Sequence, residues 1–95
     1  MKILIVIPAR WNSSRFPGKP LALINGKEMI RRVWEQCLKV KEANNCVVAT
    51  DNVKIFKFCI KNNIKVMMTS TKHKTGSDRV SEVSKKINAD IYVNV

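Results

Sequence analysis

Four short apolar segments divide the chain. They are residues 2–7 (KILIVI), 45–50 (NCVVAT), 64–69 (IKVMMT) and 90–95 (DIYVNV), and they are rich in residues that favour β-strands. Segments that are apolar at nearly every position are typical of strands buried on both faces of a parallel sheet, because a strand with one solvated face alternates apolar and polar residues. The pattern therefore predicts four strands of a parallel sheet.

The intervals between these segments have the period of amphipathic helices. In residues 28–41, apolar side chains recur on one face and charged side chains occupy the other. Residues 52–61 repeat the pattern more weakly, with Asp51 placed to cap the helix start. Residues 75–87 form a third predicted helix, and Thr75 and Asp78 have the spacing of a capping box. Strands that alternate with helices predict a right-handed, doubly wound α/β sheet.

The loop at residues 8–21 follows the first predicted strand, at the sheet edge where α/β proteins bind their ligands. It contains no acid, and its cations and neighbouring hydroxyls are Arg10, Ser13, Ser14, Arg15 and Lys19. Guanidinium groups bind phosphate oxygens in a bidentate manner, lysine adds a point charge, and Gly18 lets the backbone come close. The loop therefore predicts a polyphosphate site, with a merely solvated loop as the alternative. It is not a Walker A motif, because Pro20 follows Lys19 where serine or threonine is required.

Composition limits the size and the location of the protein. With 95 residues, of which 45% are hydrophobic and 26% charged, the chain can form at most one globular domain. Three cysteines without C-x-x-C spacing favour small buried side chains in a reducing compartment, hence the cytoplasm. The first apolar segment is too short for a secretion signal, and no segment approaches the length of a membrane span, so we expect no membrane association.

The formal net charge of +11 leaves a nucleic-acid-binding module as an alternative function. Lysine and arginine are spread along the chain, which predicts a general attraction to anions. A nucleic-acid-binding module usually combines a basic face with exposed aromatic residues, and here the aromatic residues fall mostly within apolar patterns. We therefore favour a solvated basic surface and no nucleic-acid partner.

Several motifs occur in an order and at intervals that resemble one enzyme family. They are IPAR, SSRFPGKPL, INGKEMI, VVATD and HKTGSDR, and together they extend over essentially the whole chain. This set is similar to the 3-deoxy-manno-octulosonate (Kdo) cytidylyltransferases. Cytidylyltransferases for sialic acid, pseudaminic acid or 8-amino-Kdo remain alternatives, because related enzymes share the first two motifs. The segment PARWNSSR disfavours a uridylyl- or thymidylyltransferase, because it lacks the G-x-G-x-R opening of those enzymes.

The resemblance implies a Rossmann-like, three-layer α/β nucleotide-diphospho-sugar transferase fold with a mostly parallel sheet. It also implies a cytoplasmic, homodimeric enzyme that converts CTP and Kdo into CMP-Kdo and diphosphate with Mg²⁺, for lipopolysaccharide biosynthesis. The residues implied to line the nucleotide pocket or to contact its ligand are Pro8, Ala9, Arg10, Ser14, Ser77 and Arg79. Arg15 and Lys19 are implied to act in catalysis by holding the triphosphate and the departing diphosphate. Ser77 and Arg79 would contact the cytosine, although a purely structural role at the helix start is the alternative for both.

Two polar residues outside this set are expected to have no catalytic role. Asp51 is expected to cap a helix, and His73 to be a solvated loop residue that binds no metal.

The family continues beyond a strand like DIYVNV into a segment that resembles Q-G-D-E-P, whose aspartate binds Mg²⁺. We therefore expect residues 1–95 to be the incomplete amino-terminal, nucleotide-binding part of a cytidylyltransferase domain, with the Mg²⁺ ligands beyond Val95. Such a fragment should be inactive alone, and its last strand should lie at an edge of the sheet with apolar residues exposed.

Overall fold

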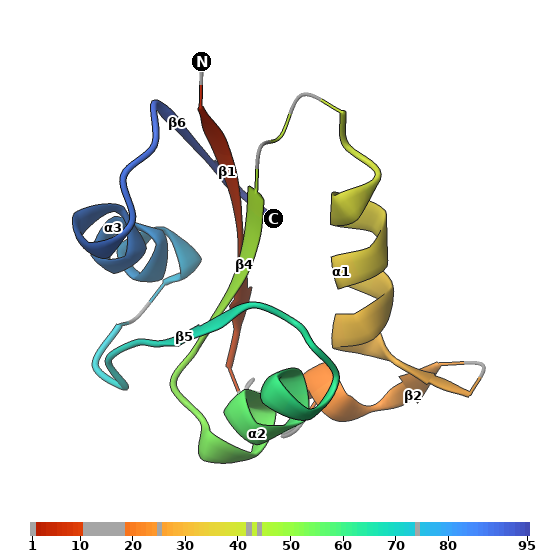
Figure 1. Cartoon of the computed structure of the whole chain (residues 1–95). Coiled ribbons are helices and arrows are strands. Elements are labelled where there is room, and N and C mark those ends of the chain that lie inside the picture. The colour runs from red at the N-terminus through yellow and green to blue at the C-terminus, as the bar shows by residue number, and fades with distance from the viewer. Residues whose placement is uncertain (1, 11–18, 25, 42, 44, 74) are drawn as a thin grey trace.

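The four predicted strands form a single parallel sheet (Figure 1). The computed structural model describes residues 2–10, 19–24, 26–41, 43, 45–73 and 75–95. The strands of this sheet are β1 (Ile3–Ala9), β4 (Asn45–Thr50), β5 (Val66–Met68) and β6 (Ile91–Asn94), in the order β5-β4-β1-β6. Every pairing between them is parallel. The doubly wound topology predicted from the sequence is therefore confirmed.

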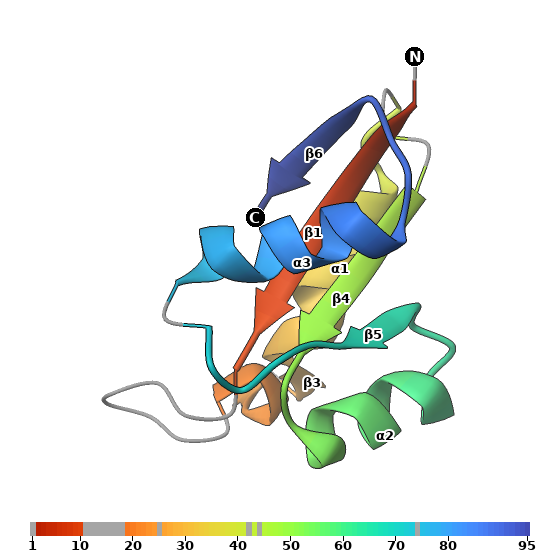
Figure 2. The same ribbon diagram turned by 90° about the vertical axis from the view of Figure 1, so that its left-hand side faces the viewer.

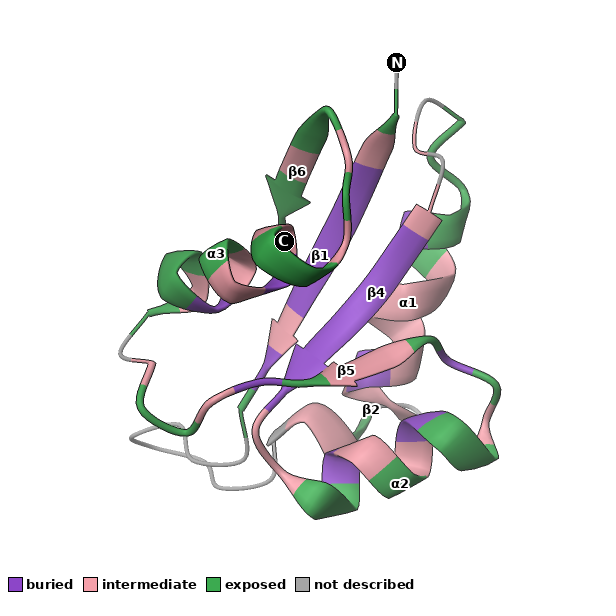
Figure 3. Cartoon of the chain, turned by 60° about the vertical axis from the view of Figure 1, so that its left-hand side comes forward, coloured by how far each residue is buried: buried purple, intermediate pink, exposed green. Residues whose placement is uncertain are grey.

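The two central strands are buried, as their continuous apolar sequences predict (Figure 3). β1 and β4 pair in a register that sets Val6 opposite Val47 and Ile7 opposite Val48. Of these four side chains none is more than 4% exposed. Each strand can be apolar at nearly every position because helices cover both faces of the sheet.

The helices lie in two layers on opposite faces of the sheet (Figures 1 and 2). α1 (Met29–Leu38) and α2 (Val53–Lys61) contribute Ile30, Cys37, Ile55 and Cys59 to one core cluster. α3 (Gly76–Lys86) contributes Val83 to a second cluster on the other face. The three layers agree with the predicted architecture, and the predicted helix at 28–41 is longer than the helix observed.

The helix starts confirm one predicted cap and correct another. Thr75 caps α3, since its hydroxyl accepts a hydrogen bond from the backbone N–H of Asp78 at 3.1 Å. Asn52, not Asp51, caps α2: its side-chain oxygen accepts from the N–H groups of Lys54 and Ile55 at 2.8 and 3.3 Å. The prediction for Asp51 is wrong because the helix begins one residue later than that cap would require, which frees the Asp51 carboxylate for another partner.

A small antiparallel hairpin was not predicted from the sequence. It pairs β2 (Leu23–Ile24) with β3 (Lys27–Glu28), after a 3-10 helix η1 (Lys19–Leu21). Gly26 has φ +80°, a backbone conformation that glycine adopts without strain, in the turn between the two strands. The backbone N–H of Met29 then donates to the carbonyl oxygen of Ala22 at 2.9 Å, which fixes the start of α1 beside η1.

The outer strand β6 is exposed, as expected for the end of this sequence. Among the strands that the structure describes, β6 pairs only with β1, and Ile91, Val93 and Val95 are each more than 40% exposed. All three cysteines are buried and free. None of the helices in the described part of the chain is long and apolar enough to span a membrane.

Candidate functional site

A pocket opens at the carboxyl end of β1. Its volume is about 250 Å³, and it is lined by Ile7, Pro8, Ala9, Arg10, Pro20, Met29, Ile30, Val33, Gly76 and Arg79. These residues come from the end of β1, from η1 and α1 on one face of the sheet, and from the first turn of α3 on the other face. The pocket therefore joins the two helical layers at one edge of the sheet.

This position is the switch point of the doubly wound sheet. The chain adds β4 and β5 on one side of β1 and then crosses to add β6 on the other. Where the strand order reverses, helices leave on opposite faces and open a crevice beyond the strand ends. Gly76 lies across this crevice, because a Cβ atom there would meet Pro8 Cγ at 3.5 Å and Asn94 Nδ2 at 3.6 Å.

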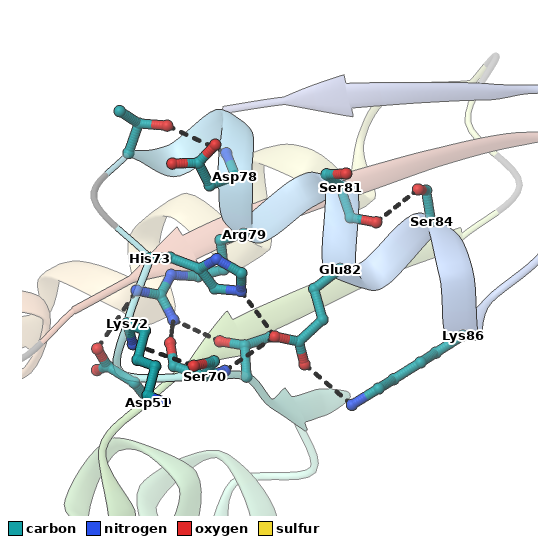
Figure 4. A network of polar contacts seen from close by, with 12 residues as sticks. Asp51, Ser70, Lys72, His73, Asp78, Arg79, Ser81, Glu82, Ser84 and Lys86 are labelled. Carbon is teal, nitrogen blue, oxygen red and sulfur yellow. Dashed lines mark hydrogen bonds and ion pairs between the residues drawn. The ribbon is translucent and has the colours of Figure 1, made fainter.

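Arg79 is the buried cation of the pocket wall. Its side chain is 0% exposed, and its guanidinium group donates three hydrogen bonds (Figure 4). Nη1 donates to the hydroxyl of Thr69 at 2.5 Å and to the carbonyl oxygen of Ser70 at 3.2 Å. Nη2 donates to Asp51 Oδ2 at 3.3 Å, and the two side chains form an ion pair. This pair gives the Asp51 carboxylate a role that its position in the sequence did not reveal.

The guanidinium group of Arg79 is not fully paired among the described residues. Its Nε atom is buried and has no hydrogen-bond partner among the residues that the structure describes. Buried N–H groups in proteins are nearly always paired, so an unpaired donor on a residue that lines a pocket indicates a group that a ligand can satisfy. The pocket therefore combines apolar walls from α1 with a desolvated positive group from α3.

Glu82 anchors the segment on which two of the Arg79 acceptors lie. Glu82 Oε1 accepts from the backbone N–H of Ser70 at 2.9 Å and lies 2.7 Å from His73 Nε2, while Oε2 accepts from Lys86 Nζ at 2.9 Å (Figure 4). The N–H of Ser70, with further contributions from Lys86 and His73, lowers the pKa of Glu82 to about 2. The expectation that His73 is a solvated loop residue is wrong, because its side chain is 20% exposed and contacts Glu82.

The structure brings four of the predicted site residues together at the pocket and leaves Ser77 outside it. Pro8, Ala9, Arg10 and Arg79 all line the pocket, with Ala9 buried and Arg10 exposed. Ser77 lies in the first turn of α3, but it is exposed and does not line the pocket. The expected contact of Ser77 with a ligand thus has no support from this geometry.

The remaining predicted residues lie in the loop after β1. Ser14 and Arg15 lie outside the described residues. Lys19 begins η1, the element that brings Pro20 to the pocket. The roles of these three residues therefore stay predictions.

Sequence reasoning missed the apolar wall and the polar support of the pocket. Met29, Ile30 and Val33 line the pocket, although their period indicated only a helix facing the core. The pairing of Asp51 with Arg79 had no signal in the sequence, because Asp51 follows β4 whereas Arg79 lies within α3, 28 residues further along the chain. The contact of Glu82 with Ser70 had none, because it depends on the path of an irregular segment.

No group of three or more histidine, cysteine, aspartate or glutamate side chains could hold a metal ion within the described ranges. The carboxylate of Asp51 is paired with Arg79.

Known proteins share both the sequence and the fold of this chain. The family model for Cytidylyltransferase matches residues 4–95. The 3-deoxy-manno-octulosonate cytidylyltransferases of Trichlorobacter lovleyi (strain ATCC BAA-1151 / DSM 17278 / SZ) and Escherichia coli are 45% and 46% identical to the chain. These matches cover 100% and 99% of the chain but 38% of each relative. The chain therefore spans about 38% of the length of these curated relatives.

Solved structures confirm the expected Rossmann-like α/β fold. The structure of CMP:2-keto-3-deoxy-manno-octonic acid synthetase complexed with CTP matches with a TM-score of 0.97 and 45% identity, over 100% of this chain and 39% of that one. A cytidylyltransferase from Leptospira borgpetersenii serovar Hardjo-bovis (strain JB197) matches with a TM-score of 0.77 and 27% identity, over 99% and 41% of the two chains. Fold, motifs and family match converge on one conclusion: the chain belongs to the cytidylyltransferase family.

Proposed function

We propose that this chain is the nucleotide-binding part of a Kdo cytidylyltransferase, which converts CTP and Kdo into CMP-Kdo and diphosphate. The observation that carries the proposal is the pocket at the switch point, with the buried guanidinium of Arg79 in its wall and an unpaired donor at Nε. Whole-chain similarity to an enzyme whose structure is complexed with CTP supports the same assignment. The cytoplasmic location and the homodimer implied by the resemblance belong to this proposal.

In the proposed reaction, the anomeric hydroxyl of Kdo attacks the α-phosphorus of CTP. A bond forms between that oxygen and phosphorus, the bond to the bridging oxygen of the diphosphate breaks, and the hydroxyl proton is released. Catalysis of such a transfer depends on positioning and on neutralising the charge of the phosphates. We assign these tasks to the loop after β1, with Arg15 and Lys19 holding the triphosphate and Arg10 adding an exposed cation at the pocket.

Arg79 is the residue that we assign to the base. Arginine only donates hydrogen bonds, so it suits the O2 and N3 acceptors of cytosine and disfavours uracil, whose N3 carries a hydrogen. The apolar side chains of Met29, Ile30 and Val33 give the base a surface to pack against.

The described residues offer no group of three or more histidine, cysteine, aspartate or glutamate side chains for the Mg²⁺ ion implied by the family, and Asp51 is paired with Arg79. The roles proposed for Arg79 and Arg15 therefore do not depend on a metal ligand from this chain.

Nucleotide binding by the full-length protein that carries this sequence tests the proposal. Calorimetric titration should give tighter binding of CTP than of UTP or ATP, and Arg79→Met should remove most of that preference. Lys85→Ala, at an exposed position on the same helix, is the matched control and should leave it unchanged. Equal affinity of wild type for the three nucleotides, or an unchanged preference in Arg79→Met, would remove the base contact from the proposal.

Steady-state kinetics test the loop in the same protein. Arg15→Ala should lower kcat by about 10²–10³, because a charge that meets the departing diphosphate acts in the transition state. Kinetics equal to wild type would exclude the loop from the mechanism.

Comparison of Kdo with 8-amino-Kdo, sialic acid and pseudaminic acid as acceptors decides which sugar the enzyme uses. Binding of single-stranded RNA with a steep salt dependence, in place of CTP binding, would instead support a nucleic-acid module.

A further inference from the structure

The support of Arg79 extends to residues that do not touch the pocket. Of the three acceptors around its guanidinium group, Asp51 contributes a side chain from the end of β4. The other two, the Thr69 hydroxyl and the Ser70 carbonyl oxygen, lie on the segment 69–73 that follows β5. The position of Arg79 therefore depends on the position of this segment.

Segment 69–73 forms neither helix nor strand. At its start, the backbone N–H of Thr69 donates to the carbonyl oxygen of Thr50 at 2.8 Å, which continues the pairing of β4 with β5. Beyond that point, the segment contacts α3 through Arg79, as described above, and through Glu82: Oε1 of Glu82 accepts from the N–H of Ser70 at 2.9 Å and lies 2.7 Å from His73 Nε2. Glu82 thus connects both a backbone group and a side chain of the segment to α3.

Arg79 and Glu82 are three residues apart on α3, so they lie on the same face of the helix. Arg79 donates to the segment while Glu82 accepts from it, and Ser70 takes part in both contacts through its carbonyl oxygen and its N–H (Figure 4). The two contacts therefore hold both backbone polar groups of Ser70 against α3. Hydrogen bonds to an ionised carboxylate are among the stronger ones in proteins, so Glu82 is suited to hold the segment in place.

We propose that Glu82 is a positioning residue for Arg79: by holding segment 69–73 against α3, it keeps the Arg79 guanidinium group oriented in the pocket wall for the base of CTP. This inference rests on the proposed function, in which Arg79 contacts the base. Glu82 itself touches no ligand in this arrangement, since it does not line the pocket.

The test is nucleotide binding by the full-length protein with substitutions at Glu82. Glu82→Ala should weaken CTP binding by about tenfold and reduce the preference for CTP over UTP, because a displaced guanidinium no longer distinguishes the two bases. Glu82→Gln, which can still accept from Ser70 but lacks the charge, should show a smaller loss of the same kind and keeps the test usable if the alanine variant fails to fold. Lys86→Ala is the matched control. Lys86 contacts only the other carboxylate oxygen and is 53% exposed, so its loss should leave the preference intact.

A double substitution separates positioning from a general structural role. In an Arg79→Met background, Glu82→Gln should cause no further change in the ratio of CTP to UTP affinity, because the group that it positions is gone. An equal drop of that ratio in both backgrounds, or an unchanged ratio in both Glu82 variants, would overturn the inference. An unchanged ratio in Arg79→Met alone would instead overturn the base contact in the proposed function, so the two failures are distinguishable.

Discussion

Replacing Asp51 should destabilise the protein more than replacing its ion-pair partner Arg79. The Arg79 side chain is 0% exposed, whereas that of Asp51 is 16% exposed. Asp51→Asn therefore leaves a buried guanidinium group without its counter-charge, while Arg79→Met leaves a carboxylate that water can reach. Because loss of one partner leaves the other charge uncompensated, the more deeply buried survivor suffers the larger penalty.

The geometry sets the magnitude. Arg79 Nη2 lies 3.3 Å from Asp51 Oδ2, and two unit charges at that distance attract by about 5 kcal/mol at an effective dielectric constant of about 20. Thr69 and Ser70 still accept from Nη1 in Asp51→Asn, and the asparagine oxygen can accept from Nη2. We therefore expect Asp51→Asn to lower the free energy of unfolding by about 2–3 kcal/mol. Arg79→Met should lower it by about 1 kcal/mol, since methionine retains much of the buried volume.

Urea unfolding of the full-length protein, both single variants and the double variant measures these quantities. The double variant should be more stable than Asp51→Asn alone by about 1–2 kcal/mol, because the second substitution removes the uncompensated charge. If the double variant instead loses the sum of the two single effects within about 0.5 kcal/mol, Asp51 does not compensate Arg79 and the reasoning is refuted.

Three further predictions concern the core, the thiols and the response to acid. Ile55→Ala should lower the free energy of unfolding by about 2–5 kcal/mol, whereas Ile60→Ala on the same helix, 58% exposed in place of 0%, should change it by less than about 0.5 kcal/mol; equal losses in urea unfolding would contradict this. Burial raises the pKa of Cys59 to about 11. Iodoacetamide at about pH 8 should therefore alkylate Cys59 about 10²-fold more slowly in the folded protein than in urea, as measured by mass spectrometry of the peptide that contains it. The pKa of Glu82 is lowered from 4.5 to about 2, chiefly by the Ser70 N–H, so the stability that it contributes is fully present above pH 4.5 and is lost as the pH falls toward 2. Urea unfolding at about pH 5 and about pH 3 should therefore show a smaller loss in Glu82→Gln than in wild type, and an equal loss would exclude Glu82 as a source of the acid sensitivity.

The parts of the fold that could be predicted are those set by local pattern. Residues 45–50 are apolar at nearly every position, and β4 spans the same residues. Thr75 and Asp78 have capping-box spacing, and Thr75 caps α3. The hairpin of β2 and β3 escaped prediction because strands of two residues are too short to display a period. Asp51 and Asn52 are both competent caps, and the sequence alone does not distinguish which of two such neighbours begins a helix.

The position of the site at the sheet edge could be predicted from the topology and the resemblance. Parallel strands bring their carboxyl ends to one edge, which predicted a ligand near the loop after β1 and its cation Arg10. The resemblance then assigned Pro8, Ala9 and Arg10 to the pocket. Arg79 reached the same pocket from the resemblance, but its burial and its acceptors could not be foreseen. Its contact with Thr69 depends on where an irregular segment turns after β5, and no periodicity encodes that path.

The burial of Arg79 bears on how the pocket would recognise a nucleotide. An exposed arginine must lose water and side-chain freedom when it binds a ligand, and both losses weaken the affinity. Arg79 has already lost its water, and Asp51, Thr69 and Ser70 hold its guanidinium group in place. The free energy needed to order the guanidinium group is therefore spent when the protein folds, and the ion pair with Asp51 and the contacts of Glu82 offset it. A group held in this way discriminates by fixed geometry. Loosening its support should therefore reduce the selectivity between bases more than it reduces binding of the phosphates, which we propose to be the task of the loop after β1.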